Sequence, residues 1–185
     1  MKKLIIATFA ALAVIIPVLA GHDLKAEPAS PTGNSAWTKK GRETGFPVPR
    51  FVSLKSREAR MRIGPSTDYA TAYIYSARGL PLEITEEYGH WRRVRDMDGA
   101  SGWMAAALLS GDRTAVIGPW LKKPVPLRSD PNMSATVVAT LQPRVLLGIR
   151  HCNGTWCEAT LMRHNLSGYV DQASLWGVYP GETIR

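Results

Sequence analysis

Two cysteines near the C-terminal end of the chain could form a covalent bond. Cys152 and Cys157 are the only cysteines of the 185 residues, and they flank the tetrapeptide Asn-Gly-Thr-Trp. Asn-Gly is the strongest short signal for a tight hairpin turn, so the turn should bring the two cysteines together. We therefore expect a local Cys152–Cys157 disulfide.

A metal site made by the two cysteines with His151 and His164 is the alternative. Zinc accepts thiolate and imidazole ligands, but the spacing of these four residues matches no standard zinc pattern. Cys157 as a catalytic nucleophile would need a second domain to build its cleft. We expect neither, and we expect no cofactor.

Trp91 is the main candidate for binding a ligand. In the run Trp91–Asp96, strand alternation places Trp91, Arg93 and Arg95 on one face and Val94 on the other. Val94 is the natural core residue, so Trp91 should point away from the core. An outward aromatic ring beside arginines can stack on a ligand and hold its carboxylates. The alternative is that Trp91 only covers the edge of the fold.

Pairs of carboxylates also occur, at Glu86-Glu87 and at Asp96 and Asp98. Acid–base catalysis would need a pocket that shifts the pKa of one member of such a pair. Both pairs border turns, so we expect solvated acids and no enzyme activity.

These candidates lie on short segments bounded by turns, which is typical of an all-β protein. The expected strands of the first half are Arg50–Leu54, Ala59–Ile63, Leu80–Tyr88, Trp91–Asp96 and Ser101–Met104. Ala70–Tyr75 is ambiguous between a strand and a helical turn, and Ala105–Leu109 is expected to be a short helical turn. About five short strands in about 60 residues predict a small, strongly bent sheet or barrel.

The second half of the chain repeats the first. Arg62, Pro65, Gly102, Leu109 and Gly111 match Arg128, Pro131, Gly168, Leu175 and Gly177, each 66 positions later. Trp91 matches Trp156 at a distance of 65 positions. We place repeat one at residues 50–111 and repeat two at residues 112–178.

The two repeats differ beside their tryptophans. Trp156 is followed by Ala159 and Thr160, where repeat one has Val94 and Arg95. The cationic partners are therefore missing there, and we expect repeat one to carry the ligand-binding surface.

The segment before the repeats carries an export signal and a linker. Two lysines precede an uncharged apolar run over residues 4–20, which is the layout of a secretory signal peptide. We expect residues 1–20 to be removed, with Ala26 as an alternative cleavage site, and no stable membrane span afterwards. Residues 21–49 are rich in Pro, Gly, Ser and Thr and show no apolar period, so they predict a flexible tether.

Export also bears on the redox state and on possible partners. An exported chain reaches an oxidising compartment such as the periplasm, which favours a disulfide. The net charge falls from +8 to +6 when the two lysines of the signal are removed. A mildly basic protein can hold weakly to anionic surfaces, but no basic run is long enough to suggest nucleic acid as a partner. The sequence does not indicate an oligomeric state.

Repeat one resembles the bacterial Src-homology-3-like (SH3-like) domains. Met61–Ser66 is similar to the Val-Arg-x-Gly-Pro-Ser signature of that family, and Tyr69 follows at the usual place. The similarity continues in Gly89-His90, Trp91, Val94, Asp98-Gly99, Gly102–Met104 and Leu108-Leu109. Repeat two is a similar but degenerate copy, with Asp130 in place of the signature glycine.

The resemblance implies two tandem half-open barrels of five to seven strands each. Family members often bind cell-wall peptides or peptidoglycan, and in eukaryotic relatives a tryptophan at the matching position lines the peptide groove. We therefore expect a periplasmic, non-catalytic protein that binds peptidoglycan or its stem peptides through Trp91, Arg93, Arg95 and Tyr69. A protein-interaction adaptor that binds peptide segments of an envelope protein is the alternative. An enzyme would need a polar pocket shared by both repeats.

Overall fold

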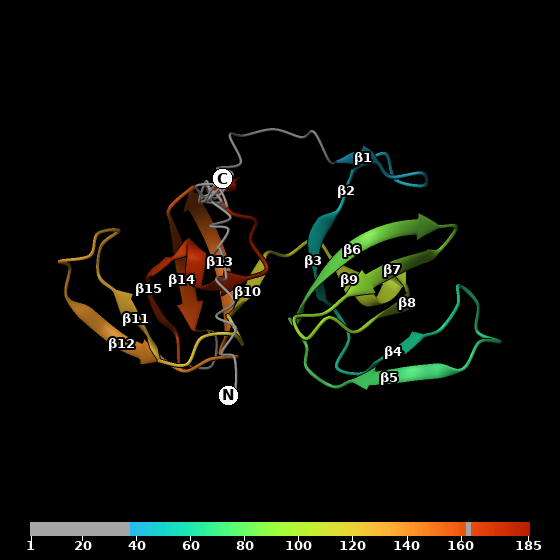
Figure 1. Ribbon diagram of the computed structural model, residues 1–185, viewed down its shortest axis with the longest axis horizontal. Coiled ribbons are helices and arrows are strands. Elements are labelled where there is room, and N and C mark those ends of the chain that lie inside the picture. Colours follow the sequence, from blue (N-terminus) through green and yellow to red (C-terminus); the bar gives the residue numbers. More distant parts are fainter. Residues whose placement is uncertain (1–37, 162–163) are drawn as a thin grey trace, which may run out of the picture. The chain divides into compact units, whose positions relative to one another are not determined.

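Each repeat forms one curled antiparallel sheet, and the two sheets have the same strand order. The structure is a computed structural model that describes residues 38–161 and 164–185 (Figure 1). The expected signal peptide, residues 1–20, lies outside the described residues. The all-β fold class and the tandem arrangement expected from the sequence are confirmed.

Repeat one contains seven strands in the order β5-β4-β8-β7-β6-β3-β9. Their bounds are β3 (Arg50–Leu54), β4 (Ala59–Arg62), β5 (Thr71–Tyr75), β6 (Pro81–Tyr88), β7 (Trp91–Arg95), β8 (Ser101–Ala105) and β9 (Leu109–Ser110). A short 3-10 helix, η1 (Ala106–Leu108), joins β8 to β9, as the sequence predicts. The segment Ala70–Tyr75, which was ambiguous in the sequence, contains the edge strand β5.

Repeat two follows the same path, in the order β12-β11-β15-β14-β13-β10-β16. Its elements are β10 (Thr114–Ile117), β11 (Val125–Arg128), β12 (Val137–Leu141), β13 (Leu146–Asn153), β14 (Trp156–Leu161), β15 (Leu166–Asp171), η2 (Gln172–Ser174) and β16 (Leu175–Trp176). One further strand, β17 (Thr183–Ile184), pairs with β13. Each element of repeat one therefore has a counterpart in repeat two.

Tight turns set the register of the long central hairpin in each repeat. Between β6 and β7 the turn begins at Gly89, whose φ of +50° suits glycine. Between β13 and β14, Gly154 has a φ of +95°, and the side-chain oxygen of Asn153 accepts hydrogen bonds from two backbone N–H groups that follow it. The Asn153-Gly154 dipeptide thus forms the tight hairpin turn that the sequence predicts.

A glycine recurs in both repeats where two strands come close together. A Cβ atom at Gly102 of β8 would lie 2.6 Å from the carbonyl oxygen of Arg62 on β4. In repeat two, a Cβ atom at Gly168 would lie 2.6 Å from the carbonyl oxygen of Arg128. This close approach lets the sheet curl, and it explains why these residues match at the 66-residue spacing.

The turn after β4 has the same backbone hydrogen bond as its counterpart in repeat two, although Gly64 is replaced by Asp130 there. A Cβ atom at Gly64 would lie 2.6 Å from the ring of Tyr69. Repeat two has Ala135 in place of that tyrosine, so Asp130 has space for its side chain. In both turns the backbone N–H two residues further on donates to the carbonyl oxygen, at 3.0 Å for Gly64 and 2.8 Å for Asp130. The degenerate copy therefore keeps the turn.

Each repeat has its own apolar core. The buried core of repeat one consists of Val52, Leu54, Ala59, Met61, Leu82, Ile84, Val94 and Met104. The buried core of repeat two consists of Ala115, Ile117, Val125, Leu127, Leu141, Leu147, Ile149, Cys152, Cys157, Ala159, Val170, Leu175 and Val178. Val94 is fully buried, as the alternation along β7 predicts.

Residues 38–49, which the sequence places in the tether, fold onto repeat one. Strands β1 (Lys39–Lys40) and β2 (Pro47–Val48) pair with each other. The loop between them is held by the buried carboxylate of Glu87, which accepts hydrogen bonds from the backbone N–H and the hydroxyl of Thr44 and from one more N–H group. The polar segment that we expected to be a tether therefore provides the hydrogen-bond donors for the carboxylate of Glu87.

Aromatic and charged side chains join the two repeats. Phe51 of β3 packs against the rings of Trp176 and Tyr179, with centroids 5.2 Å and 4.6 Å away. The hydroxyl of Tyr179 donates to Glu83 at 3.0 Å, and Arg95 donates to the same carboxylate at 2.8 Å. The Arg95 guanidinium also lies 5.6 Å from the centre of the Trp176 ring. These contacts bury Glu83 of β6.

Candidate ligand-binding grooves

Trp91 lines a pocket of about 290 Å³ in repeat one, here called pocket one. Its lining consists of Glu58, Ala59, Arg60, Arg62, Thr67, Trp91, Ala105 and Leu108. They come from β4 and the residue before it, the turn after β4, the start of β7 and the end of β8 with η1. Within the part of the chain that the structure describes, every lining residue belongs to repeat one, so repeat two does not fill this pocket.

The position of Trp91 follows from the alternation along β7. Arg92 and Val94 are buried, whereas Arg93 and Arg95 are exposed and Trp91 is half-buried. Trp91 pairs with Ala105 on β8, at the end of the hairpin. The ring is thus fixed by the sheet on one side and reaches the pocket on the other.

The cations of pocket one come from β4 instead of β7. Arg62 donates from Nη1 to the carbonyl oxygen of Tyr69 at 2.6 Å, which ties the loop after β4 to the strand. The side chain of Arg60 is 57% exposed, and its nearest acid is Glu58 at 3.9 Å. An anionic group of a ligand can therefore pair with Arg60 at little cost, because the existing ion pair is long and solvated.

Arg93, Arg95 and Tyr69 do not line this pocket with Trp91. Arg93 pairs loosely with Glu86 at 3.5 Å on the outer face of the sheet. Arg95 is held by the contacts between the repeats. The ring of Tyr69 is about half exposed and packs beside the signature turn. Of the four residues that we expected to bind a ligand, only Trp91 lines this pocket.

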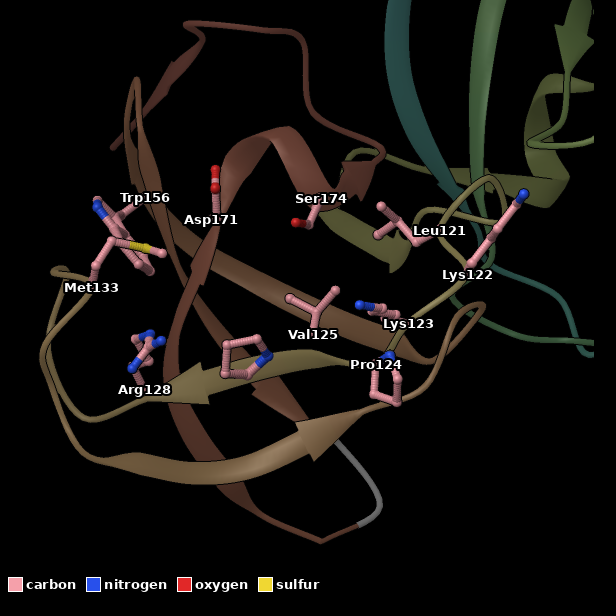
Figure 2. Close-up of a pocket in the computed structure, with 11 residues that line it drawn as sticks. Leu121, Lys122, Lys123, Pro124, Val125, Arg128, Met133, Trp156, Asp171 and Ser174 are labelled. Atoms are coloured by element: carbon pink, nitrogen blue, oxygen red, sulfur yellow. The ribbon is translucent and has the colours of Figure 1, made fainter.

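Repeat two contains a larger pocket at the equivalent position, with a volume of about 470 Å³, here called pocket two. The counterparts of the eight residues of pocket one all line it: Pro124, Val125, Pro126, Arg128, Met133, Trp156, Asp171 and Ser174. Leu121, Lys122 and Lys123 extend it. Figure 2 shows Trp156 and Met133 toward one end and Leu121 and Lys122 toward the other.

Pocket two is more apolar than pocket one, but it keeps a cationic rim. Prolines replace Glu58 and Arg60, and Met133, which is 69% exposed, replaces a threonine. Arg128 donates to the carbonyl of the loop after β11 at 2.8 Å, as Arg62 does in repeat one. The buried Nε atom of Arg128 has no hydrogen-bond partner among the described residues. Sequence reasoning missed this pocket because it considered only the cations that follow Trp156 on its own strand.

The predicted Cys152–Cys157 disulfide is confirmed. The two residues are cross-strand partners at the end of the β13–β14 hairpin, with Cα atoms 4.1 Å apart, and both are fully buried. Their sulfur atoms are bonded to each other, so they are not available as thiolates for the alternative metal site. No cluster of three or more potential metal ligands occurs among residues 38–161 and 164–185.

The carboxylates beside the turns hold the structure, and two of them are buried instead of solvated. Asp96 accepts hydrogen bonds from the N–H groups of Asp98 and Ala100 and from the hydroxyl of Tyr75. Burial, followed by the hydrogen bond to Asp96, raises the pKa of Tyr75 above its usual value. The expectation of solvated acids was therefore wrong for Asp96 and for Glu87, because several local donors satisfy each of them.

Glu87 has an unusual pKa. Burial alone raises it, but hydrogen bonds from Thr44, Arg50 and the N–H groups of the β1–β2 loop outweigh burial and lower the pKa of Glu87 to about 2. Its nearest cations are Arg50 at 2.7 Å and Arg92 at 3.6 Å. A carboxylate held in its ionised form by so many donors acts as a structural anchor and not as an acid–base catalyst.

Comparison with known proteins identifies the family. Two solved structures, of NlpC2 and NlpC1 from Trichomonas vaginalis, share 12% identity with the chain, with TM-scores of 0.30 and 0.31. The matches cover 70% and 77% of this chain but 48% and 50% of those proteins, so the chain spans about half their length. No curated protein matches the chain.

The model of the bacterial SH3 domain matches residues 55–111 and again residues 121–177. The chain therefore belongs to the bacterial SH3 domain family and carries two copies of that domain.

Proposed function

We propose that the protein is a non-catalytic binding protein of the bacterial envelope, which contacts peptidoglycan or its stem peptides through pocket one. The observation that carries this proposal is the open pocket beside Trp91, with Arg60 and Arg62 on the adjacent strand. A partly exposed indole ring offers a flat apolar surface, and guanidinium groups pair with carboxylates. Stem peptides are short, flexible and anionic, so they match both features.

The expected signal peptide and the disulfide support a periplasmic location. A buried disulfide is typical of proteins that fold in an oxidising space, such as the periplasm. Across residues 38–161 and 164–185, no helix has the length and apolarity needed to cross a bilayer.

Sedimentation with purified peptidoglycan sacculi tests the proposal. The wild-type protein should pellet with the sacculi, and Trp91→Ala should weaken this binding by more than about tenfold, since a central aromatic contributes about 2 kcal/mol or more. Trp120→Ala is the matched control, because Trp120 is 54% exposed and lines neither pocket. A wild-type protein that stays in the supernatant at every concentration would refute the proposal.

An adaptor for envelope proteins is the second candidate, and the edge strand β5 favours it. Tyr73 and Ile74 of this strand are 53% and 59% exposed, and β5 has a free edge in the described sheet. A peptide segment can add to such an edge as a further strand. An adaptor predicts no sedimentation with sacculi, and a photo-crosslinker at position 73 would capture a specific envelope protein in cells.

A further inference from the structure

We infer that pocket two is a second binding site, which takes an apolar side chain next to a carboxylate, so that the protein binds one anionic polymer at two places. This inference rests on the proposed function of pocket one. It concerns the repeat in which the sequence gives Trp156 no cationic neighbours on its own strand.

The lining of pocket two supports an apolar contact. Trp156 is half-buried, as Trp91 is in repeat one, and it lies in a pocket whose other walls include Pro124, Pro126 and Met133. The exposed methionine is flexible and polarisable, so it can adapt to side chains of different shape. The larger volume, about 470 Å³ against about 290 Å³, leaves space for a bulkier group than pocket one accepts.

The charges of pocket two support a carboxylate as the second element. Lys122, Lys123 and Arg128 line it, and among the described residues the only acid of the lining is Asp171. The carboxylate of Asp171 already accepts a hydrogen bond from the backbone N–H of Ala173, where it caps η2. The free charge of the pocket is therefore positive, which complements an anionic ligand.

The covalent connection of the two pockets makes simultaneous binding effective. Strand β9 of repeat one ends at Ser110 and strand β10 of repeat two begins at Thr114, so the pockets cannot separate far. Once one pocket is occupied, the other experiences a high effective concentration of the neighbouring ligand on the same polymer. Avidity of this kind can exceed the affinity of a single site by a factor of about 100 or more.

Two ligand preparations and two variants test the inference. The probes are intact sacculi and the soluble monomeric muropeptides released from them, and the variants are Trp91→Ala and Trp156→Ala. We expect two muropeptides per wild-type chain and one per chain of either variant, measured by isothermal titration calorimetry. Either variant should lose about 100-fold in affinity for sacculi, and the double variant should lose all binding.

Further variants separate binding from folding. Met133→Asp and the pair Lys122→Glu with Lys123→Glu change pocket two without removing Trp156, and Met133 is exposed enough to tolerate the change. They should also reduce the stoichiometry to one muropeptide. One muropeptide per wild-type chain, together with Trp156→Ala and Met133→Asp variants that bind sacculi normally, would overturn the second site and leave the proposed function intact. No binding of either probe by the wild-type protein would refute the proposed function itself.

Discussion

The two repeats connect the strands of their central hairpins by different cross-strand side-chain pairs. In repeat one, Glu87 and Arg92 are cross-strand partners, and both side chains are almost fully buried. In repeat two the equivalent partners are Cys152 and Cys157, which form the disulfide. An ionic anchor depends on pH and a disulfide depends on redox conditions, so one fold responds to two different stresses.

The difference also decides which neighbouring segment each hairpin holds. Glu87 gathers donors from the β1–β2 loop, 43 and 44 positions earlier in the sequence, and from Arg50. A disulfide offers no such acceptors, and repeat two instead adds β17 to β13 through backbone pairing at Cys152 and Asn153. In repeat one, the Glu87 side chain therefore holds the neighbouring segment. In repeat two, backbone pairing between β13 and β17 holds it.

The largest effect on stability is expected at the ionic anchor. Glu87→Gln would leave Arg92 and Arg50 partly buried without their counter-charge, and we expect a loss of about 3 kcal/mol in the free energy of unfolding. Urea unfolding followed by tryptophan fluorescence measures the loss. Glu86→Gln is the matched control, because its carboxylate is half exposed and should change little. Equal stability of both variants would show that the anchor is not an important source of stability.

The same anchor predicts the response to acid. The pKa of Glu87 is about 2 in the folded protein and near 4.5 in an unfolded chain. Its contribution is therefore complete above about pH 4.5 and is lost as the pH falls toward 2. Unfolding free energies measured between pH 6 and 2 should fall more steeply for the wild type than for Glu87→Gln. Parallel curves would contradict the assignment.

Reduction of the disulfide should have a smaller effect, limited to repeat two. The bond closes a short loop, so we expect it to contribute about 2 kcal/mol. Hydrogen exchange followed by mass spectrometry should show faster exchange in β13 and β14 after reduction, with β6 and β7 unchanged. Free thiols in protein purified from the periplasm would argue against the bond in the native state.

The contact between the repeats should contribute least of these. Tyr179→Phe removes one hydrogen bond to the buried carboxylate of Glu83, and we expect a loss of about 1 kcal/mol. Asp98→Asn weakens a second contact between the repeats, the exposed ion pair with Arg144, and should change the melting temperature less than Tyr179→Phe does, because solvent screens this pair. A larger effect of Asp98→Asn than of Tyr179→Phe would mean that the repeats meet through different contacts.

Local sequence patterns predicted most of the fold. The bounds of β3 match the expected segment, and the turns at Gly89 and Asn153-Gly154 are where the sequence places them. The disulfide also followed from a local hairpin. Such features depend on residues close together in the chain, so alternation and turn chemistry are sufficient to predict them.

The candidate site was harder to predict because it depends on distant residues. Arg60 and Arg62 reach the pocket of Trp91 only because β4 pairs with β8, so the cations that line this pocket are not the ones that follow Trp91 in the sequence. The contact between Tyr179 and Glu83 likewise joins residues that are 96 positions apart in the sequence. The alternation of residues within one strand cannot predict contacts between residues that are distant in the sequence.

The most direct test of the proposed function measures melting temperature and muropeptide affinity on the same sample of Trp91→Ala. We predict a melting temperature close to that of the wild type, because the ring of Trp91 is only half-buried and lies outside the core cluster. We also predict that pocket one loses its muropeptide, with a decrease in affinity of more than about tenfold. A variant that melts earlier but binds muropeptides as the wild type does would contradict the proposal and leave Trp91 a structural residue.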